Sequence, residues 1–314
     1  MHQLAIVALD GVMDSSLAIT LDTLRTANAF APKQKIAWSV VGQRKTITTG
    51  GGMRIDADRT LRDKPENDWV IIPGLGLTTE QAIEVRLKQK DARAAMEAIQ
   101  TANVAASCSA VFLLAEAGVL DERMATTTWW LARTFRERYP KVQLDESRML
   151  VRDGRFLTAG SAFAQLDLVL AIITATLGPK VAHLCSRYML IDRRASQARY
   201  MIPSHVRHVD ETVLAAERWI DANLAGPMNV AEIADAVAVS PKTLARRIVA
   251  ATGLSPVRFL QRRRVMEAVH LLETTALNID DVAERVGYQD ATALRKIIKR
   301  ELGIAPSALR NHAL

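Results

Sequence analysis

Two patterns of hydrophobic positions divide the chain. Up to about residue 185, short apolar runs alternate with segments whose apolar residues recur at helical spacing. The runs predict strands at 4–9, 36–41, 69–72, 104–106 and 156–157, and the amphipathic segments predict helices at 17–29, 80–100, 110–117, 131–139 and 162–177. Because strands and helices alternate, we expect an α/β fold with a layered and mostly parallel sheet. From about residue 211 the pattern is helical throughout.

The last third of the chain contains an internal repeat. The segment that starts at Val230 recurs at Ile279, in sequence pattern and in the spacing of its apolar residues. Each copy predicts a short helix, a tight turn, and a second helix capped by Ser240 or Asp290, which is the helix-turn-helix signature. Gly287 suits a left-handed turn in the second copy. A long amphipathic helix, roughly 256–273, joins the copies, so we expect an all-α domain with two helix-turn-helix units.

The second helix of each unit, about 241–251 and 291–302, places polar side chains opposite its buried leucine. Two such helices on a rigid support would enter successive major grooves of DNA, about 34 Å apart. Arginine and lysine can donate to guanine, threonine can meet a thymine methyl, and flanking cations suit phosphate. The alternative is a helical adaptor whose charges only face water. The candidate DNA-binding residues are Lys242, Thr243, Arg246, Arg247, Thr292, Arg295, Lys296 and Lys299.

Residues from about 211 to 311 resemble the DNA-binding domain of the AraC family, most clearly in IDDVAERVGYQDATALRKIIKRELGIAPSALR. This resemblance implies a seven-helix bundle and a sequence-specific regulator of transcription that binds double-stranded promoter DNA. The N-terminal part resembles the PfpI-like, class I glutamine amidotransferase-like superfamily, which implies a flavodoxin-like layered sheet. The segments that carry this second resemblance are LDGVMDSSLAITLDTLRTAN, DWVIIPGLG, ASCSAVFLLAEAGVLDERMATTTWW and LTAGSAFAQLDLVLAII.

The combination of the two parts resembles the GlxA-type regulators, whose members often sense nitrogen-containing metabolites. It implies three regions: a PfpI-like sensor and oligomerisation domain at 1–186, a basic linker at 187–210, and an AraC-type domain at 211–314. The implied partners are promoter DNA, a small-molecule effector, a second copy of the chain, and RNA polymerase if the protein activates transcription.

Cys108 stands between a predicted strand and a predicted helix, where a nucleophile elbow would hold its side chain. A thiolate nucleophile needs a nearby base, usually histidine oriented by a carboxylate. Against the resemblance, Ser109 and Thr128 stand where related proteins carry histidine, and Ser16 stands where active relatives carry an acid, although Asp14 is close by. We therefore expect no catalysis by this domain.

Two interpretations of Cys108 remain: a pocket that binds a small molecule, or a buried thiol that only packs. The candidate ligand-binding residues are Ser16, Gly74, Cys108, Ser109 and Thr128. The alternative function is a cysteine-dependent amidase or hydrolase attached to a DNA-binding domain. Its base would have to be His183, the first histidine after His2.

Composition and charge bear on the partner, the cellular compartment and the need for a cofactor. The net charge of +7 and the pI of about 9.6 permit a polyanionic partner without requiring one. The two cysteines are too few for a disulfide framework and fit a cytoplasmic protein. No apolar run is long enough for a membrane span, and the N-terminus does not resemble a signal peptide. No phosphate loop occurs. His205 and His208 are three residues apart, which could suit a metal pair on a helix, but no carboxylate pattern lies near them, so we expect no cofactor and no metal.

Overall fold

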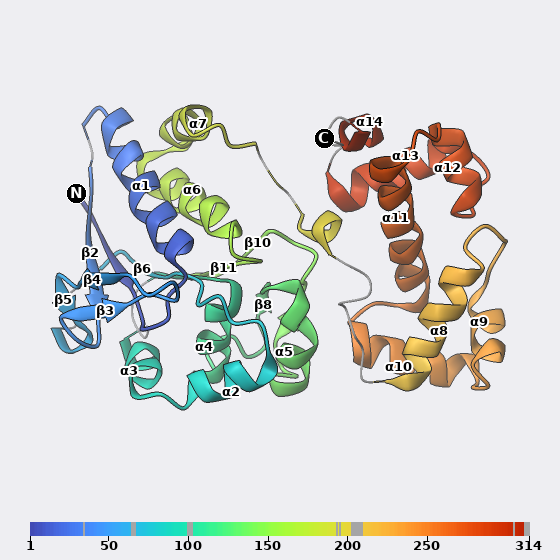
Figure 1. Cartoon of the computed structure of the whole chain (residues 1–314), viewed down its shortest axis with the longest axis horizontal. Helices are drawn as coiled ribbons and strands as arrows, with labels where there is room; N and C mark the ends of the chain where they lie inside the picture. The colour runs from blue at the N-terminus through green and yellow to red at the C-terminus, as the bar shows by residue number, and fades with distance from the viewer. Residues whose placement is uncertain are drawn as a thin grey trace. The chain divides into compact units, whose positions relative to one another are not determined.

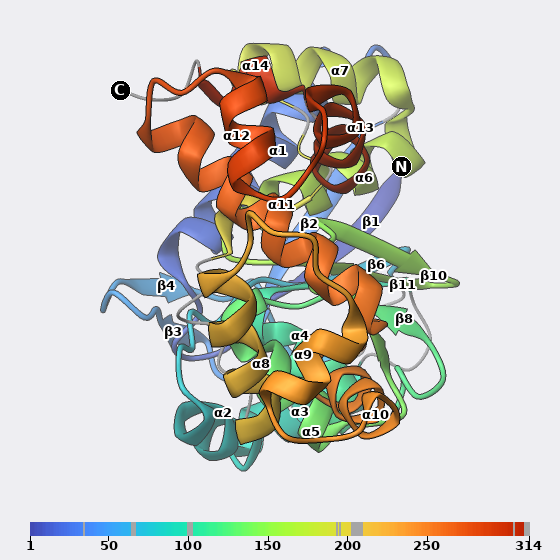
Figure 2. The ribbon, with the colours of Figure 1, turned by 90° about the vertical axis from the view of Figure 1, so that its right-hand side faces the viewer.

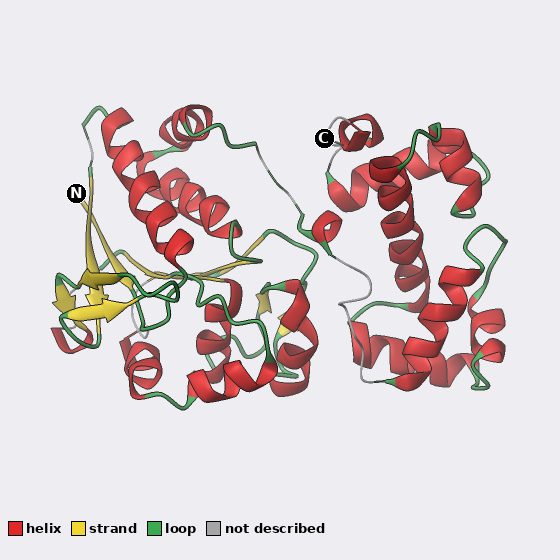
Figure 3. Ribbon diagram, viewed as in Figure 1, coloured by secondary structure: helices red, strands yellow, loops and turns green. Residues whose placement is uncertain are grey.

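The computed structural model divides into two compact units, residues 1–197 and 198–314. It describes residues 1–33, 35–63, 67–98, 103–192, 194, 196–201, 210–303 and 305–310. Within these ranges all strands belong to the first unit and the second unit is helical, as Figure 3 shows. No helix in the described ranges combines the length and the apolar character that crossing a bilayer requires.

A seven-stranded sheet forms the centre of the N-terminal unit. Its spatial order is β10-β11-β7-β6-β1-β2-β5, and every neighbouring pair is parallel except β10 and β11. The chain adds β2 on one side of β1 and later β6 on the other, which creates a topological switch point between β1 and β6. The α/β prediction is confirmed. The strands are β1 (His2–Val7), β2 (Ile36–Gly42), β5 (Arg59–Thr60), β6 (Trp69–Ile72), β7 (Asn103–Ser107), β10 (Leu150–Asp153) and β11 (Phe156–Ala159).

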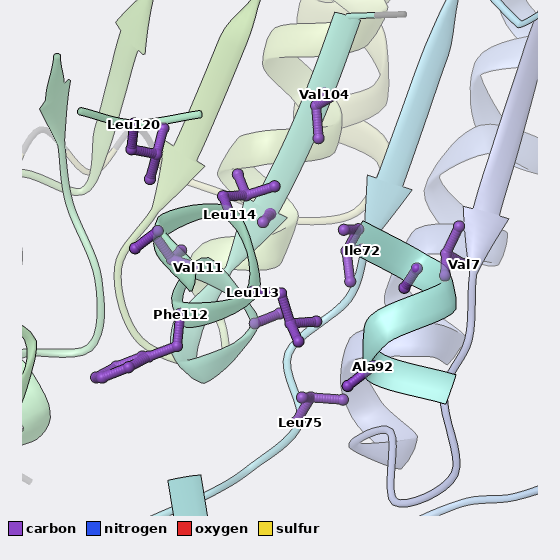
Figure 4. Close-up of a cluster of buried hydrophobic side chains, with 14 of the residues drawn as sticks. Val7, Ile72, Leu75, Ala92, Val104, Val111, Phe112, Leu113, Leu114 and Leu120 are labelled. Carbon is purple, nitrogen blue, oxygen red and sulfur yellow. The ribbon is translucent and has the colours of Figure 1, made fainter. Parts of the chain in front are cut away.

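Helices cover both faces of this sheet, so its central strands are apolar on both sides (Figure 1). In β1, Ala5 and Val7 join one hydrophobic cluster and Leu4 and Ile6 join the other, as the two-residue period of a strand requires. The first cluster receives α2 (Glu80–Leu87), α3 (Lys90–Ala98), α4 (Val111–Glu116) and α5 (Ala132–Arg138); Figure 4 shows residues of α4 packed beside β6 and β7. The second receives α1 (Asp14–Phe30), α6 (Ala164–Leu177) and α7 (Pro179–Tyr188).

The prediction of one helix over 80–100 is wrong. The chain forms α2 and α3 with a break at Lys88–Gln89, and residues 99–100 lie outside the described ranges. At the break, the buried Arg86 guanidinium donates two hydrogen bonds of 2.7 Å to the Asp91 carboxylate. This ion pair connects the end of α2 to the start of α3, across the break where the sequence pattern alone suggested a continuous helix.

Several short elements escaped prediction because two to four residues carry too little periodicity. Besides β5 and β10, these are β3 (Thr46–Thr48), β4 (Arg54–Asp56), β8 (Met124–Ala125), β9 (Gln143–Leu144), and the 3-10 turns η1 (Leu61–Asp63), η2 (Cys108–Ala110), η3 (Trp129–Leu131) and η4 (Ala198–Tyr200). The ten-residue helix α7 was not predicted either. β3 and β4 form an antiparallel hairpin.

The C-terminal unit has two hydrophobic clusters joined by one long helix. Phe259 and Leu260 of α11 pack in the first cluster, and Val265, Val269 and Leu272 of the same helix pack in the second. Figure 2 shows α11 between α8–α10 and α12–α14. The prediction of two helix-turn-helix units with a connecting helix is confirmed. The described helices are α8 (Glu211–Ala222), α9 (Val230–Ala236), α10 (Pro241–Thr252), α11 (Pro256–Thr274), α12 (Ile279–Arg285), α13 (Ala291–Leu302) and α14 (Pro306–Arg310).

Candidate functional site

The carboxyl ends of the central strands bring three of the predicted ligand-binding residues together. Cys108 follows β7 directly, Gly74 lies two residues beyond β6, and Ser16 lies in the first turn of α1. A Cβ atom on Gly74 would lie 3.0 Å from Cys108 Cβ and 3.3 Å from Ser16 Oγ. Glycine thus permits this close approach, since a side chain at position 74 would push its neighbours apart by a few tenths of an ångström. The site lies at the switch point between β1 and β6, where open α/β sheets usually bind ligands.

The Cys108 turn is strained and tightly held. Cys108 has φ of +55°, a left-handed conformation that is uncommon for a residue with a side chain and characteristic of functional turns. Its backbone N–H donates to the Gly160 carbonyl at 2.7 Å, and its carbonyl accepts from Thr127 Oγ1 at 2.8 Å. Ser109, next in the chain, accepts a hydrogen bond from the Leu77 backbone N–H at 3.2 Å. These bonds tie the turn to three separate segments.

Three hydroxyl groups around the thiol are completely buried. Ser16, Ser107 and Thr128 are each 0% exposed, and the side-chain oxygens of Ser16 and Ser107 have no hydrogen-bond partner among the described residues. Ser107 lies 3.4 Å from the Cβ position of Gly74, so it belongs to the same cluster. An unsatisfied buried hydroxyl costs about 1–3 kcal/mol, and two in one place suggest a function. Sequence reasoning missed Ser107, whose only signal was its position before Cys108.

The surroundings of the thiol contain hydroxyl and backbone groups. Burial raises the pKa of the Cys108 thiol, and contacts with Ser109, the Thr128 hydroxyl and the Gly76 backbone lower it only in part. None of these groups is a histidine or a carboxylate. The neutral thiol is thus the stable form of Cys108 near neutral pH.

The two candidate partners for a catalytic thiol are engaged or placed elsewhere. Asp14 accepts hydrogen bonds from Thr49 Oγ1 at 2.5 Å and from the Gly51 backbone at 2.7 Å, and the Thr49 bond is the main cause of its lowered pKa. The Asp14 carboxylate therefore anchors the turn between β3 and β4. His183 is exposed on α7, whereas Cys108 is completely buried.

The first candidate reading helix, α10, begins at its predicted cap. Ser240 Oγ accepts from the Thr243 backbone N–H at 3.1 Å, and Pro241 occupies the first turn. Leu244 and Ile248 face the core, while Lys242 and Arg246 are exposed on the other side. The Thr243 hydroxyl lies 2.9 Å from Ser240 Oγ, so it takes part in the cap.

Arg247 differs from its neighbours on α10. Its guanidinium donates to both Asp210 carboxylate oxygens, at 3.1 and 3.3 Å, and to Thr212 Oγ1 at 2.9 Å. Asp210 also caps α8 by accepting from the Thr212 and Val213 backbone N–H groups. Arg247 thereby fastens α10 to the start of α8, a role that sequence reasoning did not assign.

The second candidate reading helix, α13, presents four polar side chains at helical spacing. Asp290 Oδ1 caps it by accepting from the Ala293 backbone N–H at 2.8 Å. Leu294, Ile298 and Leu302 are buried. All four predicted DNA-binding residues of this helix are exposed: Thr292, Arg295, Lys296 and Lys299.

The turns of the two helix-turn-helix units share a left-handed residue. Gly287 has φ of +77°, and Ala238, at the equivalent position of the first repeat, has φ of +54°. A Cβ on Gly287 would lie 2.3 Å from the Leu224 carbonyl oxygen and 2.6 Å from Arg264 Nη2. The second turn thus packs directly on the loop that follows α8, and only glycine fits there.

The structure gives no support to a metal site. In the described residues no group of three or more histidine, cysteine, aspartate or glutamate side chains is arranged to hold an ion. His205 and His208 lie outside these residues.

Comparison with known proteins matches both units. The N-terminal residues 2–175 match the model of the DJ-1/PfpI family, and residues 233–312 match that of a helix-turn-helix domain. The transcriptional regulator GbdR of Pseudomonas aeruginosa is 25% identical over 312 residues, which cover 97% of this chain and 83% of GbdR. CdhR, a transcriptional regulator of the same species, is 22% identical over 295 residues, covering 91% of this chain and 85% of CdhR.

Among solved structures, a putative transcriptional regulator from Vibrio parahaemolyticus has the same N-terminal fold. It matches with a TM-score of 0.52 and 19% identity, and the match covers 60% of this chain and 98% of that one. The family match spans more than half of the chain, and the curated relatives extend over nearly all of it. The chain therefore belongs to the DJ-1/PfpI family through its N-terminal unit and is an AraC-family helix-turn-helix transcription regulator that binds DNA.

Proposed function

We propose that this regulator responds to a small molecule that binds beside Cys108 and that its N-terminal unit performs no catalysis. The observation that carries the proposal is the group of three buried hydroxyls at Ser16, Ser107 and Thr128. Those of Ser16 and Ser107 have no hydrogen-bond partner among the described residues, and that of Thr128 lies against the Cys108 thiol. Hydroxyl groups can donate and accept, so they can orient a polar ligand without chemistry. Gly74, Cys108 and Ser109 complete the proposed binding site.

The non-enzymatic role is supported by the state of the thiol. Burial raises the Cys108 pKa, and the groups that contact the thiol supply no base. A cysteine amidase or hydrolase needs a thiolate and a proton acceptor. Homologous full-length proteins, GbdR and CdhR, are transcription regulators.

A thermal-shift screen tests the ligand site. The full-length protein would be heated with a panel of small nitrogen-containing metabolites, which the GlxA-type resemblance suggests. A compound present at 100 times its Kd stabilises the protein by about 2.7 kcal/mol. For Thr128→Val and for Ser16→Ala, the ligand concentration that gives the same stabilisation should be at least tenfold higher. Thr174→Val is the matched control, because the exposed Thr174 hydroxyl donates to the Leu170 carbonyl within α6. Equal stabilisation of all variants would refute the proposed site.

We further propose that α10 and α13 read DNA in successive major grooves through the exposed residues that flank their buried faces. The exposed residues are Lys242, Arg246, Thr292, Arg295, Lys296 and Lys299. The half-buried Thr243, whose hydroxyl takes part in the cap of α10, is a further candidate, and Arg247 acts mainly through α8. The packing of α11 supports this arrangement, because α11 contributes buried residues to both hydrophobic clusters of the C-terminal unit and so connects the two helix-turn-helix units. Selection of bound fragments from genomic DNA would identify the operator, and footprints about one helical turn apart are expected.

The working form we propose is a cytoplasmic homodimer with a sensor at 1–186, a connecting segment at 187–210 and a DNA-binding domain at 211–314. A dimer would have twice the 34.5 kDa mass of the chain, and sedimentation measures that mass directly. If the regulator activates transcription, RNA polymerase is a further partner. When one subunit of a dimer binds its DNA site, the α10 and α13 helices of the other subunit are held at a high local concentration near a second site.

A further inference from the structure

Gln197 is a fully buried polar residue at the last position of the N-terminal unit. Its side-chain Nε2 donates to the Thr127 carbonyl at 2.9 Å and to the Arg148 carbonyl at 3.2 Å, and it lies 3.3 Å from Thr126 Oγ1. Its Oε1 accepts from the Ser161 backbone N–H at 3.0 Å. The amide of Gln197 therefore has partners for both its donor and its acceptor, although it lies in the segment expected from sequence to be a linker.

The residues around Gln197 pack closely on its side chain. A Cβ on Gly160 would lie 2.4 Å from the Gln197 amide atoms, so any residue other than glycine would expel that amide. The backbone of Gln197 and the Ser196 hydroxyl both donate to the Ser147 carbonyl, at 2.9 and 2.7 Å. The segment 196–197 is thereby fastened by both backbone and side chains.

The segments that hold Gln197 are the same ones that hold the Cys108 backbone. Thr127 accepts from Gln197 through its carbonyl and donates to the Cys108 carbonyl through its hydroxyl. Gly160 packs on the Gln197 amide and accepts from the Cys108 N–H. Two independent paths, each through one residue, thus join Gln197 to the Cys108 turn.

On its other side, Gln197 is one peptide bond from the C-terminal unit. Ala198 is the first residue of that unit and packs against the hydrophobic cluster that includes Leu294 and Ile298 of α13. Gln197 is therefore adjacent in the chain to the first residue that packs within the C-terminal unit.

We propose that Gln197 is a positioning residue and latch that couples ligand binding beside Cys108 to the DNA-binding unit. This inference rests on the proposed ligand site. Because Ser16, Ser107 and Thr128 are completely buried, a ligand can reach them only if a surrounding segment moves. The segment 126–128 carries both the Thr128 hydroxyl and the bonds to Gln197, so ligand entry there unseats the Gln197 amide.

Coupling between two sites acts equally in both directions. If a ligand beside Cys108 releases Gln197, then releasing Gln197 by mutation must loosen the Cys108 turn without any ligand. This consequence is measurable in the protein as it exists, and it does not require the effector to be known.

Hydrogen exchange of the full-length protein provides the test. Gln197→Met keeps about the same side-chain volume and removes the hydrogen bonds of the side-chain amide, while the backbone N–H bond to the Ser147 carbonyl remains. We expect the peptide that contains the Cys108 N–H to exchange about tenfold faster or more, since local opening controls such rates. Ser196→Ala is the matched control: it removes the bond to the Ser147 carbonyl in the same segment, and the Cys108 peptide should stay within about twofold of the wild-type rate.

Unchanged exchange at Cys108 in Gln197→Met, or equal acceleration in Ser196→Ala, would overturn the latch. Neither result affects the ligand site, which the thermal-shift screen tests separately. If Gln197→Met does not fold, Gln197→Glu retains the acceptor for the Ser161 N–H and loses only the donors, and the same acceleration is expected. Trypsin cleavage after Arg194 should also be faster in either latch variant than in the control.

Discussion

Arg246 and Arg247 are neighbours on α10 for which the structure predicts opposite consequences of mutation. Arg246 is exposed on the face opposite Leu244, whereas Arg247 is bound to Asp210 and Thr212. We expect Arg246→Ala to remove a contact with DNA and to leave folding unchanged. We expect Arg247→Ala to weaken the attachment of α10 to α8 and to have little direct effect on DNA.

The magnitudes follow from the environments of the two side chains. A guanidinium bound to a base edge contributes about 1–3 kcal/mol of discrimination, and at about 1.4 kcal/mol per tenfold the Kd of Arg246→Ala should rise about 5- to 150-fold. The Arg247–Asp210 pair is 41% and 24% exposed, so solvent screens it. Such pairs are worth about 0–1 kcal/mol, which sets the expected loss in unfolding free energy for Arg247→Ala.

The assay is fluorescence anisotropy with an operator fragment recovered by genomic selection, paired with urea unfolding of each variant. Lys296→Ala on α13 extends the comparison to the second reading helix, with the same expected range as Arg246→Ala. Affinity for the operator that is unchanged in both Arg246→Ala and Lys296→Ala would refute the assigned reading faces. A larger loss of affinity in Arg247→Ala than in Arg246→Ala, with unfolding unchanged, would refute the structural role of Arg247.

Three further predictions concern stability and reactivity. Gly287→Ala should lower the unfolding free energy by about 2 kcal/mol or more, because the left-handed conformation and the nearby Leu224 carbonyl both oppose a side chain. Ala238→Gly should instead raise the unfolding free energy by about 1 kcal/mol or less. Urea unfolding measures both changes, and equal effects of the two mutations would contradict the reasoning. Asp91→Ala should cost about 3–5 kcal/mol because it leaves the buried Arg86 unpaired. Burial opposes ionisation of Asp91, but Arg86 outweighs it and lowers the carboxyl pKa, so this stabilisation is present above about pH 4 and disappears as pH falls through the folded-state pKa. Burial raises the pKa of Cys108, so this thiol should react with iodoacetamide near pH 7.5 far more slowly than a free thiol. In urea, it should react at the rate of a free thiol. Reaction of the folded protein faster than a free thiol would indicate an activated nucleophile.

Much of the C-terminal unit could be predicted because its signals act over three or four residues. Ser240 and Asp290 cap helices by binding backbone groups three positions away, and both caps occur as expected. Gly287 adopts the left-handed turn that its lack of a side chain permits. The apolar residues of α10 and α13 recur at the helical period and face the core.

The α/β architecture was predictable for a related reason, since long apolar strands alternate with amphipathic helices. The shortest strands were not, because a pairing of two residues depends on which strand lies beside it. The break at Lys88–Gln89 was also missed, since its cause is a side-chain ion pair and the helical period continues across it.

By itself the sequence determined the class of the protein, its repeated reading unit and the position of Cys108 at a strand end. Only the tertiary structure decided which polar groups meet. Thr127 is 70 residues from Gln197, and Asp210 is 37 from Arg247, so no local pattern could pair them. A polar side chain takes its role from the partner it finds when the chain folds, and that partner is set by packing between distant segments.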